Sequence, residues 1–108
     1  MIIEIVRIAV EPKAYEQLNR ALAAWSGPTT AEAGCISCRI LQEKSESQAL
    51  YYQAQWKTTE DLLRHLSGDH YKRLLGLMEL GNGPPLVEFH TVSETKGFDL
   101  IERTRNAI

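Results

Sequence analysis

The stretch "IIEIVRIAV", residues 2–10, decides the fold because both of its faces are mainly apolar. Its Ile and Val content, followed by Glu11-Pro12, predicts a β-strand. Alternation along a strand would put one set of residues on one face, Ile2, Glu4, Val6, Ile8 and Val10, and a second set on the other, Ile3, Ile5, Arg7 and Ala9. A single layer of helices covers only one face of such a sheet. Something else must therefore cover the second face.

The segments after this strand alternate between helical and extended patterns. Pro12 suits the first turn of a helix, and apolar residues recur behind it at helical spacing until Gly27-Pro28, where we expect the helix to end or to be interrupted. Two β-prone runs, "CISCRILQ" (35–42) and "ALYYQAQW" (49–56), flank the polar turn "EKSESQ" (43–48). This arrangement predicts a β-hairpin.

Two short helices and a last strand complete the pattern. Thr58 suits the N-cap of a helix over "KTTEDLLRHL" (57–66). Ser67-Gly68 separates this helix from a second one, "DHYKRLLGLMEL" (69–80), which glycines and prolines end. We expect "LVEFHTVSE" (86–94) to be the last core strand. The order β-α-β-β-α-β predicts an α+β, ferredoxin-like fold with an antiparallel sheet.

The composition narrows the class of protein. A chain of 108 residues fits one domain. Its 12 basic and 14 acidic residues are interspersed and give a net charge of −2, which argues against a nucleic-acid partner. The apolar start carries charged residues and no cleavage site, and no apolar run is long enough for a membrane span, so we expect neither a signal peptide nor a membrane partner. A chain of this kind with two cysteines favours a reducing, cytoplasmic setting.

The two cysteines, Cys35 and Cys38, have the Cys-x-x-Cys spacing found in redox and metal sites. Along a strand, residues three apart point to opposite faces and lie roughly 10 Å apart, too far for a disulfide. Thioredoxin-like pairs sit instead at the start of a helix, and structural zinc needs a second pair. We therefore expect two reduced, buried thiols that act as small apolar side chains.

Several motifs together resemble the antibiotic biosynthesis monooxygenase family, whose members are also named as quinol monooxygenases. The resemblance covers about residues 2–92 and rests on "GCISCRIL", "YYQAQWKTTEDLLRHLSGDHYKRLL" and "PPLVEFHTV". Family members show Gly-Cys at the start of the second strand, a Trp at the end of the third and a His late in the next helix, matched here by Cys35, Trp56 and His65. The family's Ser-Pro-His run corresponds to Ser67-Gly68-Asp69-His70, with Gly for Pro and one extra residue.

This resemblance implies a dimeric α+β barrel, in which two ferredoxin-like subunits pack sheet against sheet with the helices outside. It assigns residues 1–93 to the barrel domain and leaves residues 94–108 as a C-terminal tail that docks on its own or the partner subunit. The homodimer would account for the two apolar faces of the first strand. Family members include cofactor-free oxygenases of aromatic polyketides and quinols, haem-degrading enzymes and proteins that handle signalling molecules, so the fold does not fix the reaction.

The sequence gives no support to a cofactor or a metal. The haem-degrading branch uses a His as axial ligand where the resemblance places Leu75, so we exclude that chemistry. His65, His70 and His90 could converge as zinc ligands, but His65 and His70 are five apart across a helix break, whereas metal pairs on a helix are spaced i, i+4. No flavin or nicotinamide motif is present. We therefore expect that the protein works without a cofactor.

The resemblance also implies a ligand cavity between the sheet and the helices. His65 and His70 are the candidate catalytic bases; alternatively, His70 caps a helix end and His65 packs at the cavity rim. Tyr52 and Trp56 share a strand face and could stack on a flat ligand. Glu4 could orient a histidine, but we expect it in water at the end of the sheet. The residues expected to bind substrate are Val6, Tyr52, Trp56, Leu66, Tyr71 and Leu74.

Together these features predict a cofactor-independent monooxygenase that joins molecular oxygen to a small aromatic quinol or a polyketide-like substrate. An electron-rich phenolate reduces oxygen directly, so the protein need supply only an apolar pocket, a base and a donor to the developing oxyanion. One alternative is a small-molecule binding or isomerising protein on the same dimeric fold, and another is a dimer without chemistry. An interior filled by side chains would favour the alternative without chemistry.

Overall fold

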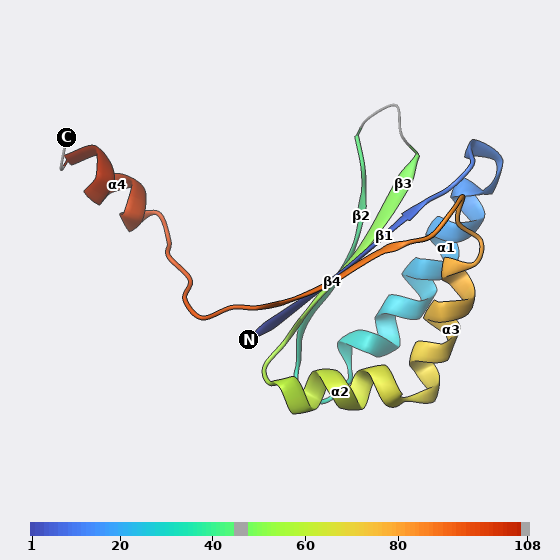
Figure 1. Ribbon diagram of the computed structural model, residues 1–108, viewed down its shortest axis with the longest axis horizontal. Coiled ribbons are helices and arrows are strands. Elements are labelled where there is room, and N and C mark those ends of the chain that lie inside the picture. Colours follow the sequence, from blue (N-terminus) through green and yellow to red (C-terminus); the bar gives the residue numbers. More distant parts are fainter. Residues whose placement is uncertain (45–47, 107–108) are drawn as a thin grey trace.

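The computed structural model describes residues 1–44 and 48–106 and contains a four-stranded antiparallel sheet with helices packed on one side (Figure 1). The strands are β1 (Ile2–Ala9), β2 (Cys35–Gln42), β3 (Ala49–Trp56) and β4 (Leu86–Thr91). The helices are α1 (Pro12–Thr30), α2 (Thr59–Ser67), α3 (Asp69–Met78) and α4 (Asp99–Asn106). The strand order β2-β3-β1-β4 confirms the predicted ferredoxin-like α+β fold. Part of the predicted turn over 43–48 lies outside the described residues.

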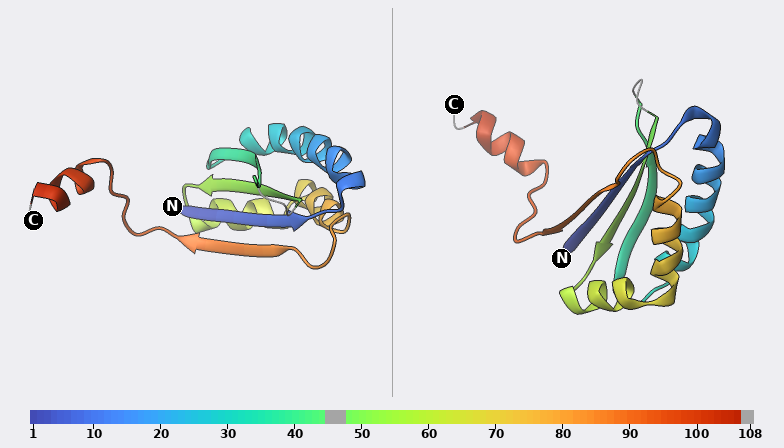
Figure 2. Two further views of the ribbon diagram at one scale, coloured as in Figure 1. Left: turned by 90° about the horizontal axis from the view of Figure 1, so that it is seen from above. Right: turned by 45° about the vertical axis from the view of Figure 1, so that its right-hand side comes forward.

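One face of β1 is buried beneath the helices. Val6 and Ile8 lie on this face and are 0% and 1% exposed. α1 and α3 run side by side over the sheet, and α2 lies near their ends (Figures 1 and 2). α1 buries Leu18, Leu22 and Trp25, which recur at helical spacing on the side toward the sheet. The core therefore lies between the sheet and the first three helices.

Within the described part of the chain, no helix lies over the opposite face of β1 (Figure 2). Ile3 and Ile5 on this face are only half-buried, and Arg7 forms an ion pair with Glu43 at 2.8 Å. β4, predicted as a core strand, is instead an exposed edge strand, since all of its residues are exposed. The reason is that β4 pairs only with β1, while α1 and α2 pack against β2 and β3.

The chain after β4 leads away from the domain. α4 lies apart from the sheet and the other helices and has no buried residue (Figures 1 and 2). This segment exposes three large apolar side chains, Phe98, Leu100 and Ile101. Its docking on the domain or on a partner stays a prediction. Among the helices of the described residues, none is both long and apolar enough to cross a membrane.

The first helix continues through the point where the sequence predicts a break. α1 runs past Gly27 and Pro28 and ends at Thr30. Proline has no N–H, so the carbonyl of Ala24 loses its usual helical donor. The helix tolerates this loss near its end, where the hydroxyl of Thr29 adds a hydrogen bond to a main-chain carbonyl one turn earlier.

The boundaries of the next two helices follow the prediction. Thr58 is the N-cap of α2, and its hydroxyl accepts a hydrogen bond from the amide of Asp61 at 3.1 Å. Gly68, in an extended conformation, separates α2 from α3. This break turns the chain so that α3 lies beside α1 (Figure 1).

A β-bulge in β2 changes where the cysteines lie. Cys35 pairs with Trp56 and Cys38 with Ala54, and the register shifts between Cys35 and Ser37. Trp56 and Ala54 lie on one face of β3, so the extra residue of the bulge turns both thiols toward the helix-covered face. The expectation that the cysteines point to opposite faces is therefore wrong. Both thiols are free and pack partly buried against the core.

Candidate active site

The helix-covered face of the sheet holds a buried carboxylate, Glu4. Its side chain is 0% exposed, and its cross-strand neighbour on β3 is the small residue Ala54. Tyr52 and Trp56 flank Ala54 on the same face of β3. The Tyr52 hydroxyl donates to Glu4 Oε1 at 2.8 Å, and the Trp56 indole N–H donates to the same oxygen at 3.1 Å. The expectation that Glu4 lies in water is wrong, because the helices cover this part of the strand.

His65 connects this carboxylate to a second one, Glu32. The last turn of α2 carries His65, whose side chain is fully buried. Its Nδ1 lies 2.7 Å from Glu32 Oε2, in the loop after α1. Its Nε2 lies 3.3 Å from the Tyr52 hydroxyl and 3.6 Å from Glu4 Oε1. Because the Glu32 side chain is 31% exposed, a chain of polar contacts runs from the surface to the middle of the sheet.

The proton positions in this cluster are constrained by its contacts. Tyr52 has one hydroxyl proton, which it donates to Glu4. In the neutral ring, the contact of Nδ1 with the Glu32 carboxylate, which can only accept, places the proton on Nδ1 and leaves Nε2 as an acceptor beside the Tyr52 hydroxyl. The Tyr52 hydroxyl lies within reach of both Glu4 Oε1 and His65 Nε2, so the contacts link the carboxylate to an imidazole nitrogen that can take up a proton.

One oxygen of the cluster has no donor. Glu4 Oε2 is buried, and none of the described residues donates a hydrogen bond to it. Leaving a buried carboxylate oxygen unpaired is unfavourable, and such atoms normally pair with water or a ligand. Burial, followed by the nearby charge of Glu4 and a contact with its carboxylate, raises the pKa of Tyr71, whose phenol is therefore close to this carboxylate but not in hydrogen-bond geometry at Oε2. A hydroxyl-bearing molecule would find an acceptor here.

Aromatic rings surround His65 and keep the cluster apolar. The Trp56 ring centroid lies 4.4 Å from that of His65, and the Tyr71 ring meets His65 edge-on at 5.0 Å. Burial, followed by the charge of Glu4, raises the pKa of Tyr52. Tyr52 therefore stays protonated at neutral pH and remains a hydrogen-bond donor. The site thus combines a proton-exchanging cluster with flat apolar walls.

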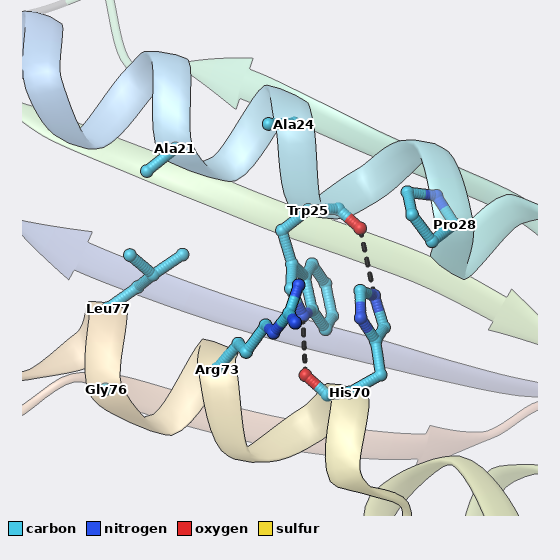
Figure 3. A pocket seen from close by; sticks show the side chains of 8 residues that line it. All are labelled: Ala21, Ala24, Trp25, Pro28, His70, Arg73, Gly76 and Leu77. Atoms are coloured by element: carbon cyan, nitrogen blue, oxygen red, sulfur yellow. Dashed lines mark hydrogen bonds between the residues drawn. The ribbon is translucent and has the colours of Figure 1, made fainter.

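A groove of about 470 Å³ lies between α1 and α3 (Figure 3). The rings of Trp25 and His70 form part of its lining and stack at 4.6 Å, 5° from parallel. The Trp25 indole N–H donates to the His70 carbonyl at 2.8 Å. His70 Nε2 lies 3.0 Å from the Trp25 carbonyl, which can only accept, so Nε2 carries a proton and Nδ1 is left as an acceptor in the neutral ring. Trp25 also meets Tyr52 edge-on at 4.9 Å and so stands between the groove and the Glu4 cluster.

The predicted site residues separate into these two places. Tyr52, Trp56, His65 and Tyr71 meet at the Glu4 cluster, while Val6 and Leu74 are buried in the same core and Leu66 is partly buried against it. His70 lies apart, in the groove, where its Nε2 contacts the carbonyl of Trp25 inside α1 rather than at a helix end. The catalytic and binding roles of all these residues stay predictions. His90 is exposed on β4, and within residues 1–44 and 48–106 no three His, Cys, Asp or Glu side chains come together as a metal site.

Sequence reasoning gave too little weight to three groups. The sequence does point to Glu4, because it is the one charged residue on a strand face whose other members are apolar, and the structure buries them all. Nothing in the sequence points to Glu32, since only the tertiary structure brings this loop residue to His65. Trp25 is one of the apolar residues that recur at helical spacing after Pro12, but its place in the groove depends on how α3 packs against α1.

Comparison with known proteins identifies related chains. The sequence profile of the family described as "Antibiotic biosynthesis monooxygenase" matches residues 1–75. A Deinococcus radiodurans protein, provisionally named an antibiotic biosynthesis monooxygenase, has a similar structure, with a TM-score of 0.81, 15% identity and coverage of 91% of this chain and 98% of that chain. Rv0793 of Mycobacterium tuberculosis has a TM-score of 0.78 and 24% identity, with coverage of 89% of this chain and 98% of that chain. PA3566 of Pseudomonas aeruginosa has a TM-score of 0.73 and 27% identity, with coverage of 86% of this chain and 94% of that chain. These structures show the shared fold, and none of the curated proteins matches the chain.

Proposed function

The chain belongs to the antibiotic biosynthesis monooxygenase family, and from this membership we propose that it is a cofactor-independent monooxygenase of a small aromatic quinol or polyketide-like molecule. Family membership by itself supports a monooxygenase-like function. The substrate class and the roles of individual residues are the proposal. One observation carries it: none of the described residues donates a hydrogen bond to the buried Glu4 Oε2, and the same carboxylate lies beside His65, whose ring contacts that of Trp56.

In this proposal the substrate hydroxyl donates to Glu4 Oε2. The rings of Trp56 and Tyr71, which both contact His65, supply surfaces for a flat ring. As the hydroxyl ionises, its proton passes into the cluster and is taken up by neutral His65, whose orientation Glu32 fixes through Nδ1. The Tyr71 phenol, kept protonated by burial, is the donor that would stabilise the developing oxyanion.

The reaction needs no external reductant. A quinol and one oxygen molecule contain the same atoms as a hydroxyquinone and one water. One oxygen atom forms a new bond to ring carbon, and the other leaves as water with two hydrogens taken from the substrate. The quinol is oxidised and supplies all the electrons, so the protein's part is to bind, deprotonate and exclude bulk water.

The alternative function for the same site is that of a binding or isomerising protein. Tyr52 and Trp56 are 0% exposed and His65 is 1% exposed, so a substrate must displace side chains to reach Glu4. An isomerase would use the same proton exchange to move a hydrogen within its substrate and would consume no oxygen. Oxygen consumption therefore separates the two functions.

The test is oxygen uptake by the purified protein with a panel of reduced quinols and anthrones. Labelled oxygen should appear in the product, because simple autoxidation yields the unlabelled quinone and hydrogen peroxide instead. His65→Ala and Glu4→Gln should lower turnover more than substrate affinity, since a base acts in the transition state. His90→Ala, which changes an exposed histidine, is the matched control and should keep full turnover.

Two results would overturn the proposal. Neither oxygen uptake nor quenching of tryptophan fluorescence by any member of the panel would exclude these substrates. Binding without oxygen uptake would move the assignment to the binding or isomerising alternative. Circular dichroism of each variant must first show that the fold is intact.

We also propose that the protein acts as a homodimer in the cytoplasm. The open face of the sheet exposes apolar residues such as Ile36, Leu41 and Leu86, and the C-terminal segment exposes Phe98 and Ile101. Apolar surfaces of this kind on a soluble domain mark interaction sites. A second copy of the chain, which carries the same two surfaces, is the partner proposed for both.

A further inference from the structure

The groove between α1 and α3 has the features of a ligand site of its own (Figure 3). We propose that it binds a planar aromatic carboxylate. Its volume of about 470 Å³ lies within the range of small-molecule sites, and its walls are mainly apolar. The inference does not rest on the proposed monooxygenase function, because Trp25 separates the groove from Tyr52 and the Glu4 cluster.

The shape of the groove is that of a slot lined by small residues. Ala21 and Ala24 of α1 face Gly76 of α3 across it. Glycine destabilises a helix relative to alanine, so a glycine within α3 needs a reason. Close packing does not explain this glycine, since a Cβ at Gly76 would meet no atom within 4 Å. The space in front of Gly76 is part of the groove and leaves room for a flat ring.

The slot also has one aromatic wall. The stacked rings of Trp25 and His70 are fixed by the hydrogen bonds that each makes to the main chain of the other's helix. A rigid aromatic surface favours a planar ligand over a flexible chain, because a ring gains contact area without losing internal rotations.

The charge of the ligand follows from Arg73. Its side chain lines the groove, and none of the ion pairs formed within residues 1–44 and 48–106 includes it. A guanidinium without a carboxylate partner matches the geometry of a ligand carboxylate.

The test is isothermal titration calorimetry of the full chain with three probes and no quinol. The probes are 2-naphthoate, its uncharged methyl ester, and decanoate, an apolar anion that is not planar. Gly76→Leu fills the slot, and Gly27→Leu is its matched control, because Gly27 is also a helical glycine with nothing within 4 Å of a Cβ but does not line the groove. Arg73→Gln removes the charge, and Lys72→Gln is the control for it on the same helix.

We expect 2-naphthoate to bind more tightly than either other probe. Gly76→Leu should lower its affinity at least about tenfold and Gly27→Leu less than about twofold. Arg73→Gln should lower the affinity for 2-naphthoate about fivefold and leave that for the ester within about twofold, while Lys72→Gln changes neither. Absence of 2-naphthoate binding, equal binding of decanoate, or equal effects of the two glycine variants would overturn the proposal.

Discussion

The two faces of β1 differ in cover, although alternate residues of one strand make both. On the helix-covered face Val6 and Ile8 are fully buried, and even the carboxylate of Glu4 is 0% exposed. On the open face Ile3 and Ile5 are only half-buried. The composition of the two faces is similar, so the difference comes from what packs over each one.

This comparison separates two uses of apolar residues. The covered face stabilises the fold and fixes a polar cluster in place, because the helices exclude water from both. The open face adds little to the stability of a single chain, since water still reaches its side chains, but it supplies an apolar surface for association. Matched substitutions on the two faces should therefore have different consequences. A substitution on the covered face should lower the stability of the fold, and one on the open face should weaken association.

The largest effect is expected from Val6→Asp on the covered face. The new carboxylate would be buried close to Glu4 without a cation for itself, which costs on the order of 3–5 kcal/mol of the free energy of unfolding. A domain of this size has about 5–15 kcal/mol in total, so the variant should lose most of its cooperative thermal transition. Val6→Ala, which removes volume but adds no charge, should cost on the order of 2 kcal/mol and stay folded. A Val6→Asp variant as stable as Val6→Ala would show that water reaches this face.

A smaller effect on the fold, and a large one on assembly, is expected from Ile5→Asp on the open face. Light scattering of the wild type at low micromolar concentration should give about twice the chain mass. Ile5→Asp should weaken this dimer, so that its melting temperature is lower and depends less on protein concentration than that of the wild type, because association stabilises the folded state by mass action only where the dimer forms. Leu63→Asp is the matched control, since Leu63 is an exposed apolar residue of α2, on the helical side. A folded wild-type monomer at this concentration would contradict the role given to the open face.

The sequence allowed most of the fold to be predicted, because hydrophobic periodicity and turn residues act locally. The strand over residues 2–10, the hairpin and the capped helix at Thr58 follow from such local signals. The exposure of β4 did not follow, because an edge strand and a core strand carry the same apolar alternation. What decides between them is the position of the helices, which is a tertiary property.

The candidate site was less predictable for the same reason. Tyr52, Trp56 and His65 were found from motifs and strand alternation, and the structure brings them together. The partners that give them chemistry come from distant parts of the chain: Glu32 lies in a loop, and only the sheet register sets Glu4 beside Tyr52. The bulge in β2 is a similar case, because one extra residue reverses the face of every side chain beyond it.

The smallest effect is expected for Cys35 and Cys38, which the bulge turns toward the covered face. Burial raises the pKa of both thiols, that of Cys38 to about 12, with smaller contributions from the charges of Glu32 and Glu4. The thiolate is the reactive form. Both cysteines should therefore react with iodoacetamide at pH 8 much more slowly in the folded chain than in urea, as mass spectrometry can measure. Replacing both with alanine should leave any quinol turnover intact.

The same pKa shifts give the cysteines a stability effect with a definite sign. A thiol whose pKa is raised in the folded chain keeps its proton after the unfolded chain has lost it at its ordinary pKa of 9.0. Between pH 9 and about 12 the unfolded state then binds fewer protons, so the free energy of unfolding falls as the pH rises, whereas below pH 9 the thiols add no pH dependence. The Cys35→Ala/Cys38→Ala variant should be less stable than the wild type at pH 7, because volume is lost from the core, and this difference should shrink toward pH 11. Tyr52 and Tyr71 are present in both the wild type and the double variant, so their contributions to the pH dependence cancel in the difference between the two. A difference that stays constant with pH would mean that the thiols ionise as freely as in the unfolded chain, and hence that the bulge does not turn them away from water.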